Sequence, residues 1–367
     1  MDLLKFAPAV FAVGDSYQIM AVAKEEATFW VKVGDRTFYD HSNGILRSAC
    51  YAHRVNVPKK LLDEAGEYTV CMRKIIERST YFPKLEDEVS KTYSFKAVSG
   101  NRTLAYHIAD SHNLTEEPVA ATKTFEKEYG KIDFLILNGD VPEDSGSVDN
   151  FDNVYKIISD ITAGGIPVVF SRGNHDMRGI KAETFAENTP SHNGKTYYNF
   201  RFGNIWVIVM DSVEDKADDS IEYGGTICCH SFRLEETDFL EDVIANSNLH
   251  YASDGIKHKI VIAHNPFTAK KSADIFDIEK ELFTKWGRLL RENVEPEVMI
   301  CGHKHSMYVD MPGSELDSYG HPCPVVVGSF LDIKKKHYAG TGFVFDDDGV
   351  EVVFTDNYGK ITDKTKI

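Results

Sequence analysis

Residues 166–179 read IPVVFSRGNHDMRG, and they join an apolar run to a group of polar side chains. The β-branched run at 166–170 is typical of a buried strand. An amide, an imidazole and a carboxylate then follow at Asn174, His175 and Asp176. Each of these groups costs free energy to bury unless it has a partner. The stretch therefore predicts a buried strand whose carboxyl end faces a polar site.

Four further apolar runs end in the same kind of side chain. They are HIADSH at 107–112, LILNGD at 135–140, VIAHNP at 261–266 and MICGHKH at 299–305. In open α/β sheets the functional crevice lies at the carboxyl ends of the strands, so these side chains are expected to converge. Glycines precede the polar groups at three of these ends, where a tight turn needs a permissive backbone: Gly139, Gly173 and Gly302.

The converging side chains are of the kinds that bind divalent metal ions. Carboxylate, imidazole and amide oxygen together suit Mn, Fe or Zn. The candidates exceed what one tetrahedral zinc requires, and two ions about 3.5–4 Å apart that share a bridging carboxylate would use them all. The predicted ligands are Asp110, His112, Asp140, Asn174, His264, His303 and His305.

Two kinds of sequence pattern divide the chain near residue 99. Residues 1–99 hold short runs with period-2 alternation, such as ATFWVKV and EYTVCMRKI, which predict antiparallel strands. The stretch LLDEAGEYTV at 61–70 resembles the tyrosine-corner entry of immunoglobulin-like and fibronectin type III sandwiches. Residues 100–367 alternate apolar strands with amphipathic helices, which predicts an α/β (α+β) domain. We expect a small β-sandwich followed by this larger domain.

Composition limits the partners and the compartment. The chain has 367 residues and a formal net charge of −16, which argues against a general nucleic-acid surface. No apolar run reaches the roughly 20 residues that span a bilayer, and the N-terminus lacks a basic leader. Six cysteines without C-x-x-C spacing indicate reduced thiols. We expect a cytoplasmic protein with no membrane partner; the alternative is a secreted protein whose signal peptide has been removed.

The ordered motifs DSH, NGD, GNHD, AHN and GHKH resemble the signature of calcineurin-like metallophosphoesterases, over about residues 102–330. The resemblance implies two stacked mixed sheets flanked by helices. It also implies that Asp140 bridges two metal ions and that His175 meets the substrate. Its first metal site would comprise Asp110, His112, Asp140 and His305; its second would comprise Asp140, Asn174, His264 and His303.

The arrangement of a β domain before this core further resembles purple acid phosphatases, with two departures. Those enzymes bind ferric iron through a tyrosine shortly after the GD motif, whereas this chain reads GDVPED there. They also lack a histidine at the position of His112. The resemblance without the tyrosine predicts a colourless metal site.

The resemblance to these two groups of enzymes implies a hydrolase of phosphate esters with a dinuclear metal site. A metal-bound hydroxide would attack phosphorus while His175 acts as the general acid. Asp176 is expected to assist catalysis by pairing with His175 or Arg172. Weaker candidates for substrate contacts are Asn113, Arg172, Arg178 and Asn265.

The sequence does not decide which phosphate ester is the substrate, and it leaves a second class of protein open. A phosphomonoesterase is the preferred interpretation, and a phosphodiesterase of the same family is the first alternative. A different class is a metal-binding protein whose β domain recognises a partner. An intact set of ligands together with His175 favours the enzyme.

Overall fold

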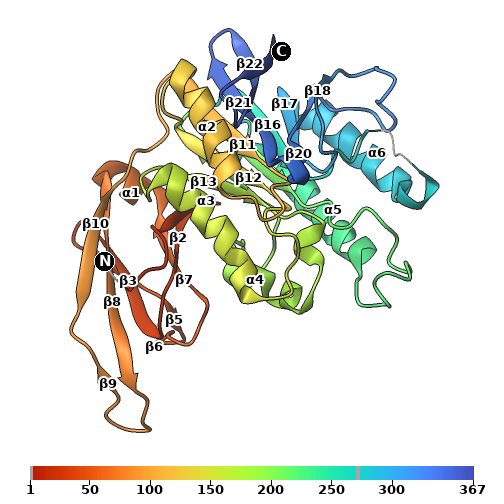
Figure 1. Cartoon of the computed structure of the whole chain (residues 1–367). Coiled ribbons are helices and arrows are strands. Elements are labelled where there is room, and N and C mark those ends of the chain that lie inside the picture. Colours follow the sequence, from red (N-terminus) through yellow and green to blue (C-terminus); the bar gives the residue numbers. More distant parts are fainter. Residues whose placement is uncertain (1–2, 270–272) are drawn as a thin grey trace.

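The structure is a computed structural model that describes residues 3–269 and 273–367. Two mixed sheets lie face to face in the larger part of the molecule, and helices cover the outer face of each (Figure 1). A smaller antiparallel β region, drawn in red and orange, lies at one end. The predicted α/β fold with a preceding antiparallel β region is therefore confirmed.

The first large sheet has the strand order β23-β22-β21-β11-β12-β13-β1-β2-β7, with β20 paired to β21. The strands β11, β12, β13 and β1 run parallel to one another. The bounds are β1 Ala9–Val13, β2 Ser16–Val22, β7 Ala52–Pro58, β11 Thr103–Ile108, β12 Phe134–Asn138, β13 Val168–Ser171, β20 Phe330–Asp332, β21 His337–Asp346, β22 Gly349–Asp356 and β23 Ile361–Lys366.

The second large sheet has the order β14-β15-β16-β17-β19-β18. Strands β15, β17 and β19 are apolar along their whole length, and alternate side chains enter two different cores. In β15, Val207 packs against the first sheet, whereas Trp206 and Ile208 pack against helices. This period-2 division explains why the sequence pattern reads as continuous rather than alternating. The bounds are β14 Tyr198–Phe202, β15 Ile205–Met210, β16 His258–Ala263, β17 Val298–Cys301, β18 Met307–Asp310 and β19 Val325–Gly328.

Amphipathic helices close the two outer faces. Helices α2 and α3 cover the first sheet through Phe125 and Ile157, and α5 and α6 cover the second through Leu240 and Trp286. The bounds are α1 Lys59–Ala65, α2 Glu116–Tyr129, α3 Asp152–Thr162, α4 Phe185–Asn188, α5 Cys229–Ala245 and α6 Lys280–Leu289, with short 3-10 or π turns at Val148–Phe151, His175–Met177, Ile180–Thr184, Ser247–Leu249, Asp274–Phe276, Leu290–Val294 and Ile333–Lys335. No described helix is long and apolar enough to cross a membrane.

The N-terminal β region contains two antiparallel layers. One is β1-β2-β7, and the other has the order β10-β8-β3-β4 with β9 beside β8. Their inward side chains, such as Ile19 and Val31, share one core. The remaining bounds are β3 Ala27–Val33, β4 Arg36–Tyr39, β5 His41–Ser42, β6 Ile45–Leu46, β8 Glu67–Glu77, β9 Lys84–Leu85 and β10 Val89–Ser94.

The N-terminal region and the larger region share a continuous sheet. Strand β1 pairs in parallel with β13, with Phe11 opposite Val168. The hydroxyl of Tyr68 donates a hydrogen bond to the Gly164 carbonyl at 2.9 Å, so this tyrosine bonds across the regions rather than within its own turn. The division of the chain at residues 99 and 100 stays a prediction. The structure adds that the layer β1-β2-β7 is hydrogen-bonded to β13 of the larger region.

Candidate metal centre

The strands that end in predicted ligands bring those ligands to one edge of the two sheets. Strands β11, β12 and β13 of the first sheet and β16 and β17 of the second end just before them. The turns that follow carry left-handed backbone at five of the predicted ligands, with φ between 41° and 70°: Asp110, His112, Asp140, His303 and His305. Such conformations are costly for these residue types and persist where the surrounding structure fixes them, typically at functional sites.

Three glycines allow these turns to approach one another. A Cβ atom on Gly139 would lie 2.4 Å from the backbone nitrogen of Gly173, and Gly139 itself has φ of +77°. A Cβ on Gly173 would lie 2.2 Å from Asp140 Oδ1. A Cβ on Gly302 would lie 2.5 Å from the Ala109 side chain. Close approach of backbone and carboxylates, more than turn geometry alone, explains the glycines that precede the ligands.

Asp140 lies at the middle of the centre. Its Oδ2 is 3.1 Å from His264 Nε2, and its Oδ1 accepts a hydrogen bond from the backbone N–H of His175 at 2.8 Å. His264 Nδ1 donates to the carbonyl of Asn138 at 2.6 Å, and this bond directs the other ring nitrogen toward the carboxylates. A backbone partner of this kind fixes the ring orientation of a histidine that binds metal.

A second group gathers around Asp110. His305 Nε2 lies 3.4 Å from Asp110 Oδ1 and 3.1 Å from His112 Nε2. Asp110 Oδ1 is buried and has no hydrogen-bond partner among the described residues. Two imidazole nitrogens that face each other beside a carboxylate oxygen without a hydrogen-bond partner form a donor set that fits a divalent cation.

The remaining two predicted ligands also face each other. Asn174 Oδ1 lies 3.0 Å from His303 Nδ1, and the opposite ring nitrogen of His303 lies 3.0 Å from Asp215 Oδ2. All seven predicted ligands are thus brought together. The ligand atoms of six of them, all but Asn174, form three groups together with that of His175; the members of each group lie within 4.8 Å of one another, and Asp140 belongs to two of the groups.

The electrostatics of the centre favour a bound cation. Burial alone would lower the pKa of His264, but the charges of Asp140 and Asp110 raise it to about 10. Burial would raise the pKa of Asp110, yet His264 and His305 hold it below its usual value. The carboxylates therefore attract positive charge to this point, which metal ions can supply.

His175 lies at the rim of the centre and is partly exposed. Its Nδ1 donates to the carbonyl oxygen of Glu143 at 2.8 Å, and Arg178 Nη1 lies 2.8 Å from its Nε2. Its ring packs edge to face against the ring of His112, with centroids 4.6 Å apart. The geometry leaves His175 able to act on a substrate or to serve as a ligand with His112 and Asp140.

The prediction that Asp176 pairs with His175 or Arg172 is wrong. Its Oδ2 accepts hydrogen bonds from the backbone N–H groups of Gly173, at 2.7 Å, and Asp140, at 3.2 Å. Arg172 instead pairs with Asp211 at 2.8 Å. Burial, followed by the charge of Asp140, raises the pKa of Asp176 to about 7. The short turn at 173–177 folds the carboxylate back onto its own backbone, so Asp176 shapes the turn that carries Asn174 and His175.

The four weaker candidates for substrate contacts have different surroundings. Arg178 reaches the ring of His175 and also lies 3.7 Å from Glu214. Asn113 is occupied by the backbone of Glu143 and by Asn153. Asn265 is buried and both polar atoms of its side chain are without hydrogen-bond partners among the described residues. The contacts of Arg172 are with Asp211 and with the ring of Phe232.

Three residues next to the centre were not identified from the sequence. Glu143 Oε2 lies 2.9 Å from His112 Nδ1, Asp215 holds His303, and the Ser329 hydroxyl donates to Asp110. Asp215 had a usable signal, because β15 ends in the acidic stretch DSVED just as the other strands end in ligands. Glu143 and Ser329 lie in loops without a pattern of their own.

Comparison with known proteins identifies the family. The calcineurin-like phosphoesterase family matches residues 104–307, more than half of the chain. A purple acid phosphatase from seeds of yellow lupin, Lupinus luteus, has a similar structure, at 12% identity and a TM-score of 0.57, over 98% of this chain and 73% of its own. A dimetal phosphatase from Danio rerio aligns at 13% identity and a TM-score of 0.45, over 69% of this chain and 95% of its own.

A search of curated protein sequences found no match. At these identities the likeness to the lupin enzyme supports the fold alone, and the family match supports the activity. The resemblance drawn from the five motifs is confirmed, and the family implies a dinuclear divalent metal site. The chain therefore belongs to the calcineurin-like phosphoesterase family and is a phosphoric ester hydrolase.

Proposed function

We propose that the protein hydrolyses phosphate monoesters at two divalent metal ions that share Asp140, with His175 as the general acid. The observation that carries this proposal is the position of Asp140. Its ligand atom is grouped with those of His264 and His303 on one side and with that of His112 on the other, and His112 is in turn grouped with Asp110 and His305. A carboxylate shared in this way is the feature that distinguishes a dinuclear centre from a single-ion site.

When bound, the pair of cations supplies a hydroxide nucleophile at neutral pH and neutralises charge on the phosphoryl oxygens. The chain's own residues orient this centre. Asp110 and Asp140 are buried carboxylates fixed by hydrogen bonds, and Asn138 and Asp215 set the ring orientations of His264 and His303. Fixed ligands of this kind hold their geometry without reorganisation during the reaction.

The contacts of His175 support its role as an acid. Because Nδ1 donates to the Glu143 carbonyl, Nε2 is the nitrogen that can pass a proton to a leaving oxygen. Arg178 Nη1 lies 2.8 Å from that same nitrogen and can only donate, so protonation of Nε2 releases the guanidinium for a group bound there. A general acid in this position typically contributes about 10²–10⁴-fold to the rate.

A pocket of about 620 Å³ adjoins Arg178 and offers space for the leaving group. Its volume lies in the usual range for small-molecule sites. The wall carries Arg178 and Lys216, two glutamates, and apolar side chains such as Met177 and Ile227. Because Lys216 pairs with Glu222 at 2.9 Å, Arg178 is the cation of this wall that faces the metal centre. A monoester carries more negative charge than a diester at neutral pH, and Arg178 supplies positive charge beyond that of the metal ions, which favours the monoester.

The metals we propose are Mn, Fe or Zn, without a tyrosinate–iron centre, so the purified protein should show no strong visible absorption band. We also propose a cytoplasmic location. All six cysteines are free thiols, which suits a reducing compartment.

The test is turnover of His175→Ala on aryl phosphates whose leaving groups differ in pKa, together with bis-aryl phosphate. Metal content should equal that of the unchanged protein, and turnover should fall about 10²–10⁴-fold, most for the poorest leaving groups. The unchanged protein should prefer the aryl phosphates to the bis-aryl phosphate. Elemental analysis measures the metal content, and initial rates measure turnover and the preference between the two kinds of substrate.

His250→Ala is the matched control, because this half-buried histidine lies outside the metal centre. Parallel loss of metal and activity in His175→Ala would make His175 a ligand. A uniform loss across leaving groups with metal retained would remove its role as an acid. Faster turnover of the bis-aryl phosphate would replace the monoester proposal with the diesterase.

A further inference from the structure

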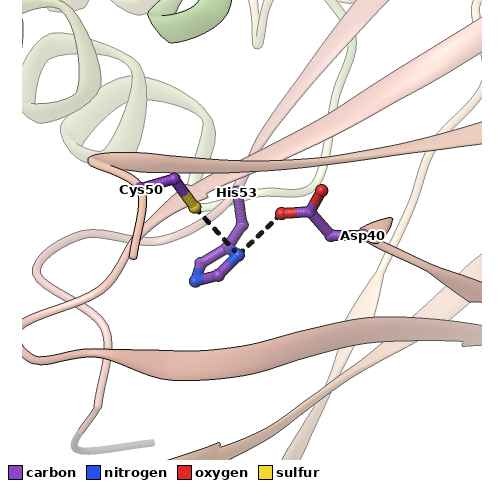
Figure 2. Close-up of side chains that lie close together, drawn as sticks. All are labelled: Asp40, Cys50 and His53. Carbon is purple, nitrogen blue, oxygen red and sulfur yellow. Dashed lines mark hydrogen bonds and ion pairs between the residues drawn. The ribbon is translucent and has the colours of Figure 1, made fainter. Parts of the chain in front are cut away.

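A second cluster of ligand-type side chains lies in the N-terminal β region, away from the predicted ligands in sequence. Asp40, Cys50 and His53 converge there, and we call them the thiol cluster (Figure 2). Among residues 3–269 and 273–367, it is the one group of three His, Cys, Asp or Glu ligand atoms within 4.8 Å that includes no residue of the metal centre.

The distances within the thiol cluster are close to those of a metal site. His53 Nδ1 lies 3.5 Å from Cys50 Sγ and 2.7 Å from Asp40 Oδ2, so both groups point at the same ring nitrogen (Figure 2). Tetrahedral zinc bonds of the usual lengths separate a nitrogen and a sulfur ligand by about 3.5 Å, and a nitrogen and an oxygen ligand by about 3.3 Å. An ion would therefore need the carboxylate to move by roughly half an ångström.

The surrounding structure already holds each side chain in place. The His53 ring stacks on Phe29, with centroids 5.1 Å apart and an interplanar angle of 10°. Asp40 Oδ1 lies 3.4 Å from the guanidinium of Arg47, which leaves Oδ2 facing the cluster. His53 and Asp40 are 0% and 2% exposed. Ligands fixed by neighbouring residues lose little conformational freedom when an ion binds.

The thiol of Cys50 suits a borderline or soft cation. Burial raises the pKa of Cys50 to about 11, so the thiol is protonated and unreactive unless a cation displaces its proton. A metal ion bound to sulfur removes that proton outright. Because Cys50 is only half-buried, solvent can occupy the fourth position of a tetrahedral site.

We propose that Asp40 Oδ2, Cys50 Sγ and His53 Nδ1 bind one divalent cation of the zinc class. The three residues come from the end of β4 and from the start of β7, so the ion would fasten the loop between these strands. The next residue in β7, Arg54, donates to the carbonyls of Ala186 and Thr189 in the larger region. The site would therefore steady the contact between the N-terminal region and the catalytic region.

The experiment is a Co²⁺ titration of the full-length protein after its metal centre has been loaded with Mn²⁺. Cobalt bound to a thiolate gives a near-ultraviolet charge-transfer band, and the seven predicted ligands of the metal centre include no sulfur. Because cobalt can also replace manganese at the metal centre, the readout is the intensity of the band at saturation, which should match one cobalt–thiolate site per chain. Cys50→Ser should abolish it, and Cys228→Ser should retain it because Cys228 is exposed and lies outside the cluster.

His53→Gln provides a second variant in case the serine variant keeps a weakened site. We expect at least about a tenfold loss of cobalt affinity in this variant. Circular dichroism checks that both variants are folded, and phosphatase turnover reports separately on the metal centre. No band in the unchanged protein, or a band that persists in Cys50→Ser, would overturn the proposal and leave the thiol cluster as an ordinary Asp–His hydrogen bond.

Discussion

The metal centre and the thiol cluster both gather imidazole and carboxylate groups, but they are built differently. In the metal centre, five ligand residues occupy left-handed backbone, and glycines permit contacts that a Cβ would block. In the thiol cluster, Asp40, Cys50 and His53 all have ordinary negative φ values. Asp40 follows β4 in one layer of the N-terminal region and His53 lies in β7 of the other layer, so their approach follows from the packing of these two layers. Strained turns and glycines mark a site whose geometry has to be exact, whereas unstrained backbone can hold three ligand groups as part of the fold.

The backbone therefore carries information that ligand composition alone does not. A search for His, Asp and Cys near one another finds both places. In the metal centre, five left-handed ligand residues lie beside three glycines that have no room for a Cβ atom, and the thiol cluster has neither feature. If the strained backbone of the metal centre serves catalysis, substitutions there should reduce metal binding and turnover, whereas substitutions in the thiol cluster should leave turnover unchanged.

The largest effect should come from Asp140→Ala. Loss of the shared carboxylate removes a ligand from both ions, so both metal content and turnover should collapse, the latter by at least about 10³-fold. Metal analysis and initial rates measure the result. Asp149→Asn, at an exposed position, is the control and should change neither. An Asp140→Ala protein that keeps two ions would show that Asp140 is not the shared ligand, and would contradict the account of the metal centre.

A smaller but more specific effect is expected from Gly173→Ala. The added Cβ would lie 2.2 Å from Asp140 Oδ1, so the carboxylate or the turn must shift. Misplacement of a reacting group by about 1 Å can cost roughly 10²-fold in rate. Gly165→Ala is the control, because its nearest neighbours would lie at 3.2 and 3.4 Å. Equal activity of the two variants would show that close packing at Gly173 is unnecessary.

The smallest of these effects is expected from Asp215→Asn. The Asp215 carboxylate lies 3.0 Å from His303 Nε2 and orients the ring from the side opposite Asn174. Loss of such a partner typically weakens metal binding about 10–100-fold while leaving the ligands in place. Competition with a chelator measures the change in affinity, with Asp219→Asn as the exposed control. If the metal affinity is unchanged, the contact between Asp215 and His303 does not contribute to metal binding.

Much of the fold and of the gathering of the site residues could be predicted from local patterns. Each run such as 135–140 is buried, ends at a strand terminus and points its polar residue toward the same edge of a sheet. The hairpin in which Phe202 pairs with Ile205 likewise has a local signal, the turn residues Gly203 and Asn204. These features depend on neighbours in sequence, which is why periodicity and turn residues reveal them.

Features that depend on distant partners could not be read in this way. The parallel pairing of β1 with β13 joins segments more than 150 residues apart and has no turn signal. The side chain of Asp176 turns back to the backbone of Gly173 because of a local 3-10 turn, and the sequence alone did not reveal that turn. The thiol cluster likewise depends on the packing of β4 and β7, which belong to different sheets, and its residues carry no motif.

Anomalous diffraction from crystals grown with Mn²⁺ tests the central claim most directly. The account predicts two manganese peaks, both within bonding distance of the Asp140 carboxylate, with Asp110 and His305 at one and His264 and His303 at the other. A single peak at this position, or two peaks of which only one contacts Asp140, would contradict the dinuclear centre proposed for this phosphoesterase.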